Sequence, residues 1–381
     1  MTSNRRICFV TGTRAEFGLM KSVLRRIEDH PKLALQIVAT GMHLDKSRGS
    51  SLDEIRAEGW KIDAIVPWAK GYSQSQTAIA TGRALAGLAE AFDRLASDII
   101  LVVGDRVEAF AAASAAHISG RLVAHVHGGD RALGLVDDSL RHAITKLAHI
   151  HFPATVQSAK RIAQLGEDRW RIFRAGSPGL DGIRADAEPW KNLAAEFPEL
   201  VRRRYVLLVL HPQSAQDEAE YELADQVLRD LQHHEEIKTI IIFPNNDPGS
   251  AGIVRRWETI EKTDQVILRR TIPRGIFLGL MRDAVALVGN SSSGIIEAAS
   301  FGTPVIDIGH RQKGRERGPN VAHVNQPGAA LRRALDRLLS TQRPIRFPPA
   351  NIYGEGNAGQ IIARTLASVP ADRFRRKLIS Y

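Results

Sequence analysis

Three consecutive serines, Ser291, Ser292 and Ser293, lie between an apolar run and a stretch of helical character. Their hydroxyls could supply a nucleophile, cap the helix, or hold an anion. A nucleophilic serine is typical of a strained Gly-x-Ser-x-Gly elbow, and Asn-Ser-Ser-Ser-Gly lacks that pattern. A helix N-terminus offers free N–H groups and a positive dipole end that attract phosphate. Because Arg311 and two further arginines follow at 310–318, we favour a phosphate site over a simple cap.

Other polar side chains of the same half also follow apolar runs. His211 comes after the run ending in Leu-Val-Leu, and Asn245 comes after Ile-Ile-Phe-Pro. Glu297 lies one helical turn beyond the serines, where it can reach a ribose diol. In parallel α/β sheets ligands bind outside the carboxyl ends of the strands, so these residues are candidates for nucleotide contacts.

The first half carries two similar loops. TGTRAEFG (11–18) resembles a glycine-rich nucleotide loop, but it is not GxGxxG, and no acid ends the second strand, which disfavours a nicotinamide cofactor. Arg14 in this loop could point into a binding cleft or face solvent. Asp105 and Arg106 directly follow another apolar strand, where an acid either caps the next helix or acts as a catalytic carboxylate. The sequence alone leaves both alternatives open.

Histidines and acids are dense between residues 124 and 152. His125 and His127 alternate along a strand and share a face, Asp130 follows shortly, and Asp137 and Arg141 share one side of a helix start. This density raises the possibility of a metal site. The chain has no CxxC and no HExxH, so we expect no metal, and we expect most of the histidines to be core residues.

The elements that must position these residues follow a strand–helix rhythm, which predicts parallel sheets covered on both faces. The first half predicts strands at 6–12, 33–40, 98–105 and 122–129, with helices that include 17–30, 77–96, 107–120 and 137–150. After a Gly/Pro-rich break the rhythm restarts, with strands at 204–212, 238–245, 265–270, 284–290 and 303–309. The intervening helices are expected at 221–234, 249–262, 273–283 and 292–302, with a last helix at 358–369.

Length and composition set the remaining limits. The 381 residues predict two domains, 1–180 and 181–381. No apolar run is long enough to insert into a membrane, no signal peptide is evident, and the single cysteine, Cys8, fits a reducing compartment, so we expect a cytoplasmic protein. The net charge of +10 is spread along the chain with only 6% aromatic residues, which gives little support to nucleic-acid binding.

Together the motifs resemble the UDP-N-acetylglucosamine 2-epimerase family, in particular its hydrolysing branch, which feeds the synthesis of sialic, legionaminic and related acids. The stretches that carry the resemblance are TGTRAEFG, GDRVE, HGGDRALGLVDDSLRHAITKLAHIHF, FPNNDPGS and GNSSSGIIEAASFGTPVIDIGHRQKGRERGPNV. The resemblance implies an α/β fold of two Rossmann-like, doubly wound domains facing a cleft, as in GT-B glycosyltransferases. It places UDP mostly on the second domain and the sugar toward the first.

The resemblance also implies roles for individual residues. Those expected to contact the nucleotide and its diphosphate are Arg14, Arg106, His211, Asn245, Ser291, Ser292, Glu297 and Arg311. The expected acid–base residues are Asp105, His127, Asp130 and Asp137, with His43 near the sugar. Many family members have glutamate where this chain has His127, so the group that takes the proton stays open between His127 and Asp130.

The expected reaction is elimination of UDP from a UDP-2-acetamido sugar to give a glycal, followed by addition of water to release the free 2-epimer. The substrate stays open between UDP-N-acetylglucosamine and a UDP-2,4-diacetamido-2,4,6-trideoxy sugar. This chemistry needs neither a metal nor a redox cofactor, and the family implies a homodimer or homotetramer. The alternatives are a non-hydrolysing 2-epimerase, a GT-B glycosyltransferase, and a nucleotide-sugar-binding protein without catalysis.

Overall fold

The computed structural model describes residues 4–44, 51–68, 74–131, 136–244, 247–261, 265–340 and 344–380. The chain forms two compact units. The first contains Met1–Asp181 and Tyr353–Tyr381, and the second contains Gly182–Ile352. No helix in the described stretches combines the length and the apolar character that a membrane crossing requires.

The first unit is built on a six-stranded sheet in which neighbouring strands pair in parallel. In spatial order its strands are β3 (Ala64–Ile65), β2 (Leu33–Ala39), β1 (Arg5–Thr11), β4 (Ile99–Val103), β5 (Leu122–Val126) and β6 (Ile150–Phe152). All residues of β4, β5 and β6 are buried, as expected for strands covered on both faces.

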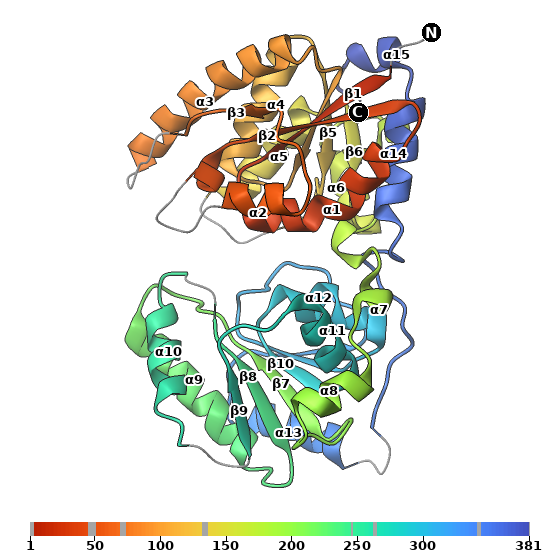
Figure 1. The fold of residues 1–381 in the computed structure, drawn as a ribbon. Helices are drawn as coiled ribbons and strands as arrows, with labels where there is room; N and C mark the ends of the chain where they lie inside the picture. The colour runs from red at the N-terminus through yellow and green to blue at the C-terminus, as the bar shows by residue number, and fades with distance from the viewer. Residues whose placement is uncertain are drawn as a thin grey trace. The chain divides into compact units, whose positions relative to one another are not determined.

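Helices cover both faces of this sheet (Figure 1). The hydrophobic cluster on one face includes residues of α1 (Arg14–Glu28) and α14 (Ala358–Ser368), and the cluster on the other includes residues of α3 (Gln74–Arg94) and α4 (Val107–Ile118). The other helical segments are η1 (Gly41–Leu44), α2 (Ser51–Ala57), α5 (Asp137–Leu147), α6 (Val156–Gln164), η3 (Arg169–Arg171), η4 (Pro178–Leu180) and α15 (Ala371–Arg375).

The second unit repeats this plan. Its parallel sheet has the spatial order β12 (Val321–Val324), β11 (Val305–Ile308), β10 (Ala286–Gly289), β7 (Tyr205–Val209), β8 (Lys238–Ile242) and β9 (Val266–Arg269). Its helical segments are α7 (Ile183–Asp186), α8 (Trp190–Glu196), α9 (Asp217–Gln232), α10 (Ser250–Glu258), α11 (Arg274–Asp283), α12 (Ser292–Ile296), η5 (Ala298–Phe301) and α13 (Ala329–Leu339).

Both sheets share the order third, second, first, fourth, fifth, sixth strand of their unit. This is the order of a doubly wound Rossmann-type sheet, so the fold class predicted from the sequence is confirmed. The strand order reverses between β1 and β4 in the first unit, and between β7 and β10 in the second. Loops diverge at such points, which makes them the expected places for a ligand.

Among the predicted elements, two helices next to the site differ from the structure in how they end or divide. The helix expected at 137–150 ends at Leu147, because Ala148 adopts an extended backbone conformation and Ile150 begins the edge strand β6. The helix expected at 292–302 is divided into α12 and η5, with the change at Glu297. Both differences concern boundaries, where apolar residues suit either a strand or a helix.

The C-terminal segment also departs from the expected division at residue 180. Residues 353–381 belong to the first unit, because α14 packs against α1 through Ile362 and Leu366. The carboxylate of Asp181 accepts hydrogen bonds from the backbone N–H groups of Ala358 and Gly359 at 2.8 and 2.7 Å. Asp181 thereby satisfies free N–H groups at the start of α14, as a capping residue does.

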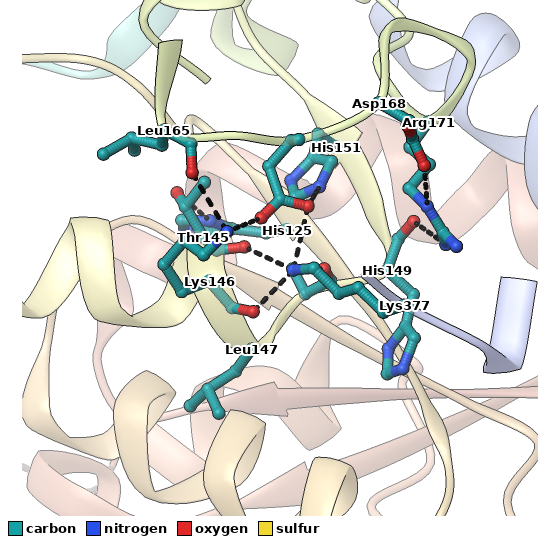
Figure 2. Close-up of polar contacts among 12 residues, drawn as sticks. His125, Thr145, Lys146, Leu147, His149, His151, Leu165, Asp168, Arg171 and Lys377 are labelled. Carbon is teal, nitrogen blue, oxygen red and sulfur yellow. Dashed lines mark hydrogen bonds and ion pairs between the residues drawn. The ribbon is translucent and has the colours of Figure 1, made fainter. Parts of the chain in front are cut away.

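Lys377 fastens the end of the chain to the first unit (Figure 2). Its ammonium group pairs with the Glu167 carboxylate at 2.9 Å and donates to the carbonyls of Thr145, Lys146 and Ala148 at the end of α5. A cation at a helix C-terminus is favourable because free carbonyls gather there. Burial of this lysine lowers its pKa to about 8 despite the attraction of Glu167.

Candidate active site

Asp105 and Arg141 form the centre of the polar cluster at the carboxyl end of the first sheet. Asp105 follows β4, and its carboxylate forms an ion pair with the Arg141 guanidinium of α5. Arg141 is buried and also donates to the His127 carbonyl at 2.8 Å. The N-cap position of α4 is occupied by Arg106, whose side chain makes no capping hydrogen bond. Asp105 is therefore a paired carboxylate in a polar cluster, and of the two alternatives left by the sequence the capping role is wrong.

Asp137 begins α5, the same helix that carries Arg141. Burial raises the pKa of the Asp137 carboxyl group, and the negative charge of Asp105 adds to this shift. A carboxyl group with a raised pKa can exchange a proton closer to neutral pH, which suits an acid–base role. The structure thus brings Asp105 and Asp137 into one electrostatic neighbourhood.

His127 and Asp130 follow β5 and form a hydrogen-bonded pair. The Nδ1 atom of His127 lies 2.8 Å from Asp130 Oδ2, and Nε2 lies 3.1 Å from the hydroxyl of Ser177. The other oxygen of Asp130 accepts from Ser158 at 2.6 Å. Burial alone would raise the pKa of Asp130, but its hydrogen bond to His127, the positive charge of that histidine when protonated, and its hydrogen bond to Ser158 outweigh burial and lower the pKa to about 2. Asp130 is therefore ionised.

Arg106 is held by an acid that the sequence analysis did not single out. Its Nε and Nη2 atoms donate to Glu108 at 3.1 and 3.0 Å, which is a bidentate pair. The Glu108 side chain is buried and packs directly against Gly12 and Gly41. A Cβ added to Gly12 would lie 2.9 Å from the Glu108 side chain, and one added to Gly41 would lie 2.6 Å from it. These two glycines leave the space that Glu108 fills. The only available signal was the acid two residues after Arg106.

A second acid, Glu16, is partly buried and lies near Glu108. Burial raises the Glu16 pKa to about 7, and the charge of Glu108 contributes to the increase. Glu16 accepts from the Gly12 N–H at 2.8 Å, while Thr13 accepts from the Glu16 N–H at 3.2 Å. This reciprocal arrangement is a capping box at the start of α1.

His43 and Arg14, which the sequence also predicted for the site, have different surroundings. His43 is buried, with Nε2 2.9 Å from Thr11 Oγ1 and Nδ1 2.8 Å from Ser51 Oγ, and burial lowers its pKa to about 4. Its ring is therefore neutral near pH 7. Arg14 is half-exposed and pairs with Glu54 at 2.6 Å.

In the second unit, Asn290 joins the two loops at the point where the strand order reverses. Its side-chain oxygen accepts from the His211 N–H at 2.7 Å, and its side-chain NH₂ donates to the His211 carbonyl at 2.8 Å. Its own carbonyl accepts from Arg311 at 3.2 Å and from Gln312 at 2.9 Å. Asn290 is fully buried and ties three predicted binding loops together, although the sequence analysis did not select it.

The serines begin the short helix α12. Ser291 is its N-cap and accepts from the Ser293 N–H at 3.3 Å, so capping is part of its role. Ser292 is the first helical residue and is only partly buried. These contacts do not test anion binding by the serines, which stays a prediction.

The other predicted nucleotide contacts lie around this helix. Glu297 pairs with Arg274 at 2.9 Å, and Arg311 lies 3.9 Å from Asp247. Burial lowers the pKa of Arg311, and the attraction of the Asp247 carboxylate only partly offsets this shift. Asn245 lies outside the described residues.

Across the described stretches of the chain, no group of three or more histidine, cysteine, aspartate or glutamate side chains has an arrangement suited to a metal ion. His117, His125, His149 and His151 instead have hydrogen-bond partners within the first unit. His125, for example, is fully buried, and its Nε2 lies 2.8 Å from the Gly104 carbonyl. Burial lowers the pKa of His125 to about 3, so this ring is neutral.

Comparison with known proteins identifies the fold and family. The family model described as UDP-N-acetylglucosamine 2-epimerase matches residues 25–367. The hydrolysing UDP-N,N'-diacetylbacillosamine 2-epimerase of Legionella pneumophila is 36% identical over 96% of both chains. A UDP-N-acetylglucosamine 2-epimerase of Neisseria meningitidis serogroup B is 35% identical over 84% of both chains.

The fold is also that of a solved structure. The crystal structure of UDP-GlcNAc 2-epimerase from Neisseria meningitidis bound to UDP-GlcNAc superimposes with a TM-score of 0.79 at 20% identity, covering 95% of this chain and 99% of the other. The two doubly wound units and their polar strand ends define an α/β enzyme of the GT-B-like type. The chain belongs to the UDP-N-acetylglucosamine 2-epimerase family, and the family predicted from its motifs is confirmed.

Proposed function

We propose that this protein is a hydrolysing 2-epimerase that converts a UDP-linked 2-acetamido sugar into UDP and the free manno-configured sugar. The observation that carries this proposal is the cluster of Asp105, Arg141, His127 and Asp137 at the carboxyl end of the first sheet. The Legionella relative, which matches over nearly its whole length, is named as a hydrolysing 2-epimerase of a UDP-linked acetamido sugar. The product would then enter nonulosonic acid synthesis.

The proposed reaction has two steps. A base of the first unit removes the C2 hydrogen as a proton while the C1–O bond breaks, so UDP leaves with the bonding electrons and a glycal remains. Water then adds its hydroxyl to C1, and a proton returns to C2 from the opposite face. The C2 hydrogen has no adjacent carbonyl, so the transition state needs both a well-placed base and a stabilised diphosphate leaving group.

The first unit supplies the groups that remove and return the proton at C2 of the sugar. Asp105 is a fixed carboxylate beside a buried cation, and Asp137 has a raised pKa that suits it to exchange protons. His127 is the base we favour of the two candidates, because the pKa of Asp130, lowered to about 2, makes that carboxylate a weak base. His43 is neutral and enclosed, so we assign it to holding the loop near the sugar.

The second unit supplies the nucleotide site in this proposal. The residues assigned to it are His211, Asn245, Ser291, Ser292, Glu297 and Arg311. The nucleotide contacts of Arg14 and Arg106, which belong to the first unit, stay predictions. The support is that His211, Ser291 and Arg311 meet around Asn290 at the point where the strand order reverses. Serine hydroxyls and arginine can hold a diphosphate through charge-assisted hydrogen bonds.

Of the two substrates left open by the sequence, we favour the diacetamido-trideoxy sugar. The Legionella relative named for it matches over 96% of both chains, whereas the Neisseria relative named for UDP-N-acetylglucosamine matches over 84%. A homodimer or homotetramer and a cytoplasmic location stay predictions. Light scattering on the purified protein measures the first, and fractionation of cells measures the second.

The test is product analysis by NMR in deuterated water with no sugar acceptor present. UDP-N,N'-diacetylbacillosamine should give UDP and a free manno sugar carrying deuterium at C2, with slower release from UDP-N-acetylglucosamine. An intact UDP-linked epimer as the only product would indicate the non-hydrolysing reaction. Turnover only after an acceptor is added would indicate a glycosyltransferase, and UDP-sugar binding without any turnover would indicate a binding protein. Asp105→Asn serves as the inactive control that should still bind UDP.

A further inference from the structure

His127 occupies an unusual backbone position directly after β5. Its φ angle is +61°, in the left-handed region that side chains other than glycine rarely adopt. The Arg141 side chain holds the His127 carbonyl at 2.8 Å, and only 8% of the residue is exposed. A strained backbone kept in place by buried contacts is a feature of functional sites.

Both nitrogens of the His127 ring have partners of different kinds. Asp130 faces Nδ1 at 2.8 Å, and the Ser177 hydroxyl faces Nε2 at 3.1 Å. Asp130 is ionised and can only accept, so Nδ1 must carry the hydrogen. In the neutral ring Nε2 is then an acceptor, and Ser177 can donate its hydroxyl hydrogen to it.

A histidine at this position needs such partners more than a glutamate does. The two oxygens of a carboxylate are equivalent, so either can accept a proton. The two nitrogens of imidazole are distinct, and only the one without hydrogen can accept. A chain with histidine at residue 127 must therefore fix which nitrogen is the base.

We propose that Ser177 is a positioning residue for His127, which, together with Asp130, holds the ring in the Nδ1–H tautomer and keeps Nε2 as the proton-accepting nitrogen. The proposal deepens the proposed function, because it rests on His127 acting as the base at C2. Neither the sequence motifs nor the family resemblance had assigned a role to Ser177.

The backbone around Ser177 fixes its hydroxyl. The Ser177 N–H donates to the Tyr353 carbonyl at 2.7 Å, and a Cβ on the preceding Gly176 (φ +84°) would lie 2.9 Å from the same carbonyl. Pro178 follows and begins η4. Ser177 is only 2% exposed, so its hydroxyl has few positions available besides the one beside His127.

The first measurement is the ¹⁵N spectrum of histidine-labelled protein without substrate, with the His127 signals assigned by their loss in His127→Gln. We expect Nδ1 to be protonated and Nε2 to be pyridine-like in the neutral ring. Ser177→Ala should shift the Nε2 resonance while Nδ1 keeps its hydrogen bond to Asp130. A neutral ring with hydrogen on Nε2, or an Nε2 resonance unchanged in Ser177→Ala, would overturn the proposal.

The second measurement is turnover. Ser177→Ala should lower kcat by about tenfold, the effect of one hydrogen bond, with the Kd for UDP unchanged. Ser177→Cys, which keeps a weak donor of similar size, should be intermediate and guards against a simple folding defect. The exposed Ser119→Ala on the same unit is the matched control. A kcat within twofold of wild type in a folded Ser177→Ala would contradict the proposal.

The two experiments separate this proposal from the proposed function. The ¹⁵N spectrum needs no substrate, so the expected tautomer with no sugar turnover would refute the proposed function alone. Turnover as proposed with the wrong tautomer would refute the role of Ser177 alone.

Discussion

Arg141 links Asp105 to His127, since one guanidinium group pairs with the Asp105 carboxylate and donates to the His127 carbonyl at 2.8 Å. Two loops that follow neighbouring strands, β4 and β5, are thereby held by one side chain of α5. The same helix begins with Asp137, so its position sets the spacing of three candidate acid–base groups.

Replacing Arg141 should therefore disable catalysis more than nucleotide binding. Arg141→Lys keeps the positive charge but lacks the planar, forked guanidinium group that contacts the Asp105 carboxylate and the His127 carbonyl together. We expect kcat to fall by roughly 100-fold, the effect of displacing a general acid or base, with little change in the Kd for UDP. Steady-state kinetics and calorimetry measure the two quantities. Arg337→Lys, at an exposed position of α13, is the control, and equal loss of both quantities would contradict the prediction.

Asn290 should matter for the nucleotide rather than for the chemistry. Asn290→Asp replaces the NH₂ group that donates to the His211 carbonyl with an acceptor, so two oxygens would face each other in a buried site. We expect the Kd for UDP to rise by at least about tenfold, since an unsatisfied buried polar group costs about 1–3 kcal/mol. Calorimetry with UDP tests this, with the exposed Asn325→Asp as control. An unchanged Kd would show that the loops hold their places without the Asn290 amide.

The raised pKa of Glu16 predicts a defined pH dependence of stability. The folded-state pKa is about 7 against an ordinary value of 4.5, because of burial and then the charge of Glu108. The folded state thus binds this proton more tightly than the unfolded state, so the stabilising contribution is complete below about pH 4.5 and is lost as pH rises through 7.

Glu16→Gln should remove that dependence, because its neutral amide mimics the protonated acid at every pH. Between pH 5 and pH 8 the urea midpoint of wild type should fall relative to that of Glu16→Gln. Comparing the two proteins at each pH cancels the titration of all other groups. A constant difference between them would mean that Glu16 titrates normally in the folded protein.

Lys377 should stabilise the first unit from the far end of the chain. Lys377→Met keeps the aliphatic length but leaves the carbonyls at the end of α5 without their cation. Glu167 retains Lys146 at 2.6 Å and His151 at 3.1 Å, so we expect a loss of about 2 kcal/mol, less than for a fully broken buried pair. Thermal unfolding and proteolysis of residues 371–380 measure this. Lys160→Met, at an exposed lysine of the same unit, should have no effect.

Much of the fold could be predicted from the sequence because apolar runs of strand length alternate with amphipathic segments. The short strands β3 and β12 lacked such a run, since Ala64–Ile65 has two residues and Val321–Val324 is partly exposed. The placement of 353–381 could not be predicted either. This placement depends on the contact of α14 with α1, two helices far apart in the chain, and no pattern within either helix predicts that contact.

The candidate site shows a similar limit. Motif spacing selected Asp105, Asp137 and His127, which lie near one another in the first unit. It did not select Asn290 or Ser177, because each contacts a residue of a separate loop. It also did not select Glu108, which pairs with Arg106 only two residues away. The sequence alone also could not show whether Asp105 caps α4, because its ion-pair partner Arg141 lies 36 residues away.

The chain crosses from the first unit to the second after Asp181 and returns before Tyr353, so one unit is nested within the sequence of the other. On the ribosome, the inner unit emerges as one continuous stretch and can fold at once. The outer unit must wait for α14, α15 and Lys377, which follow the inner unit in the chain, before the packing around α1 is complete. Until then the apolar face of α1 stays open, and this interval is when the nascent protein is most exposed to aggregation and most dependent on chaperones.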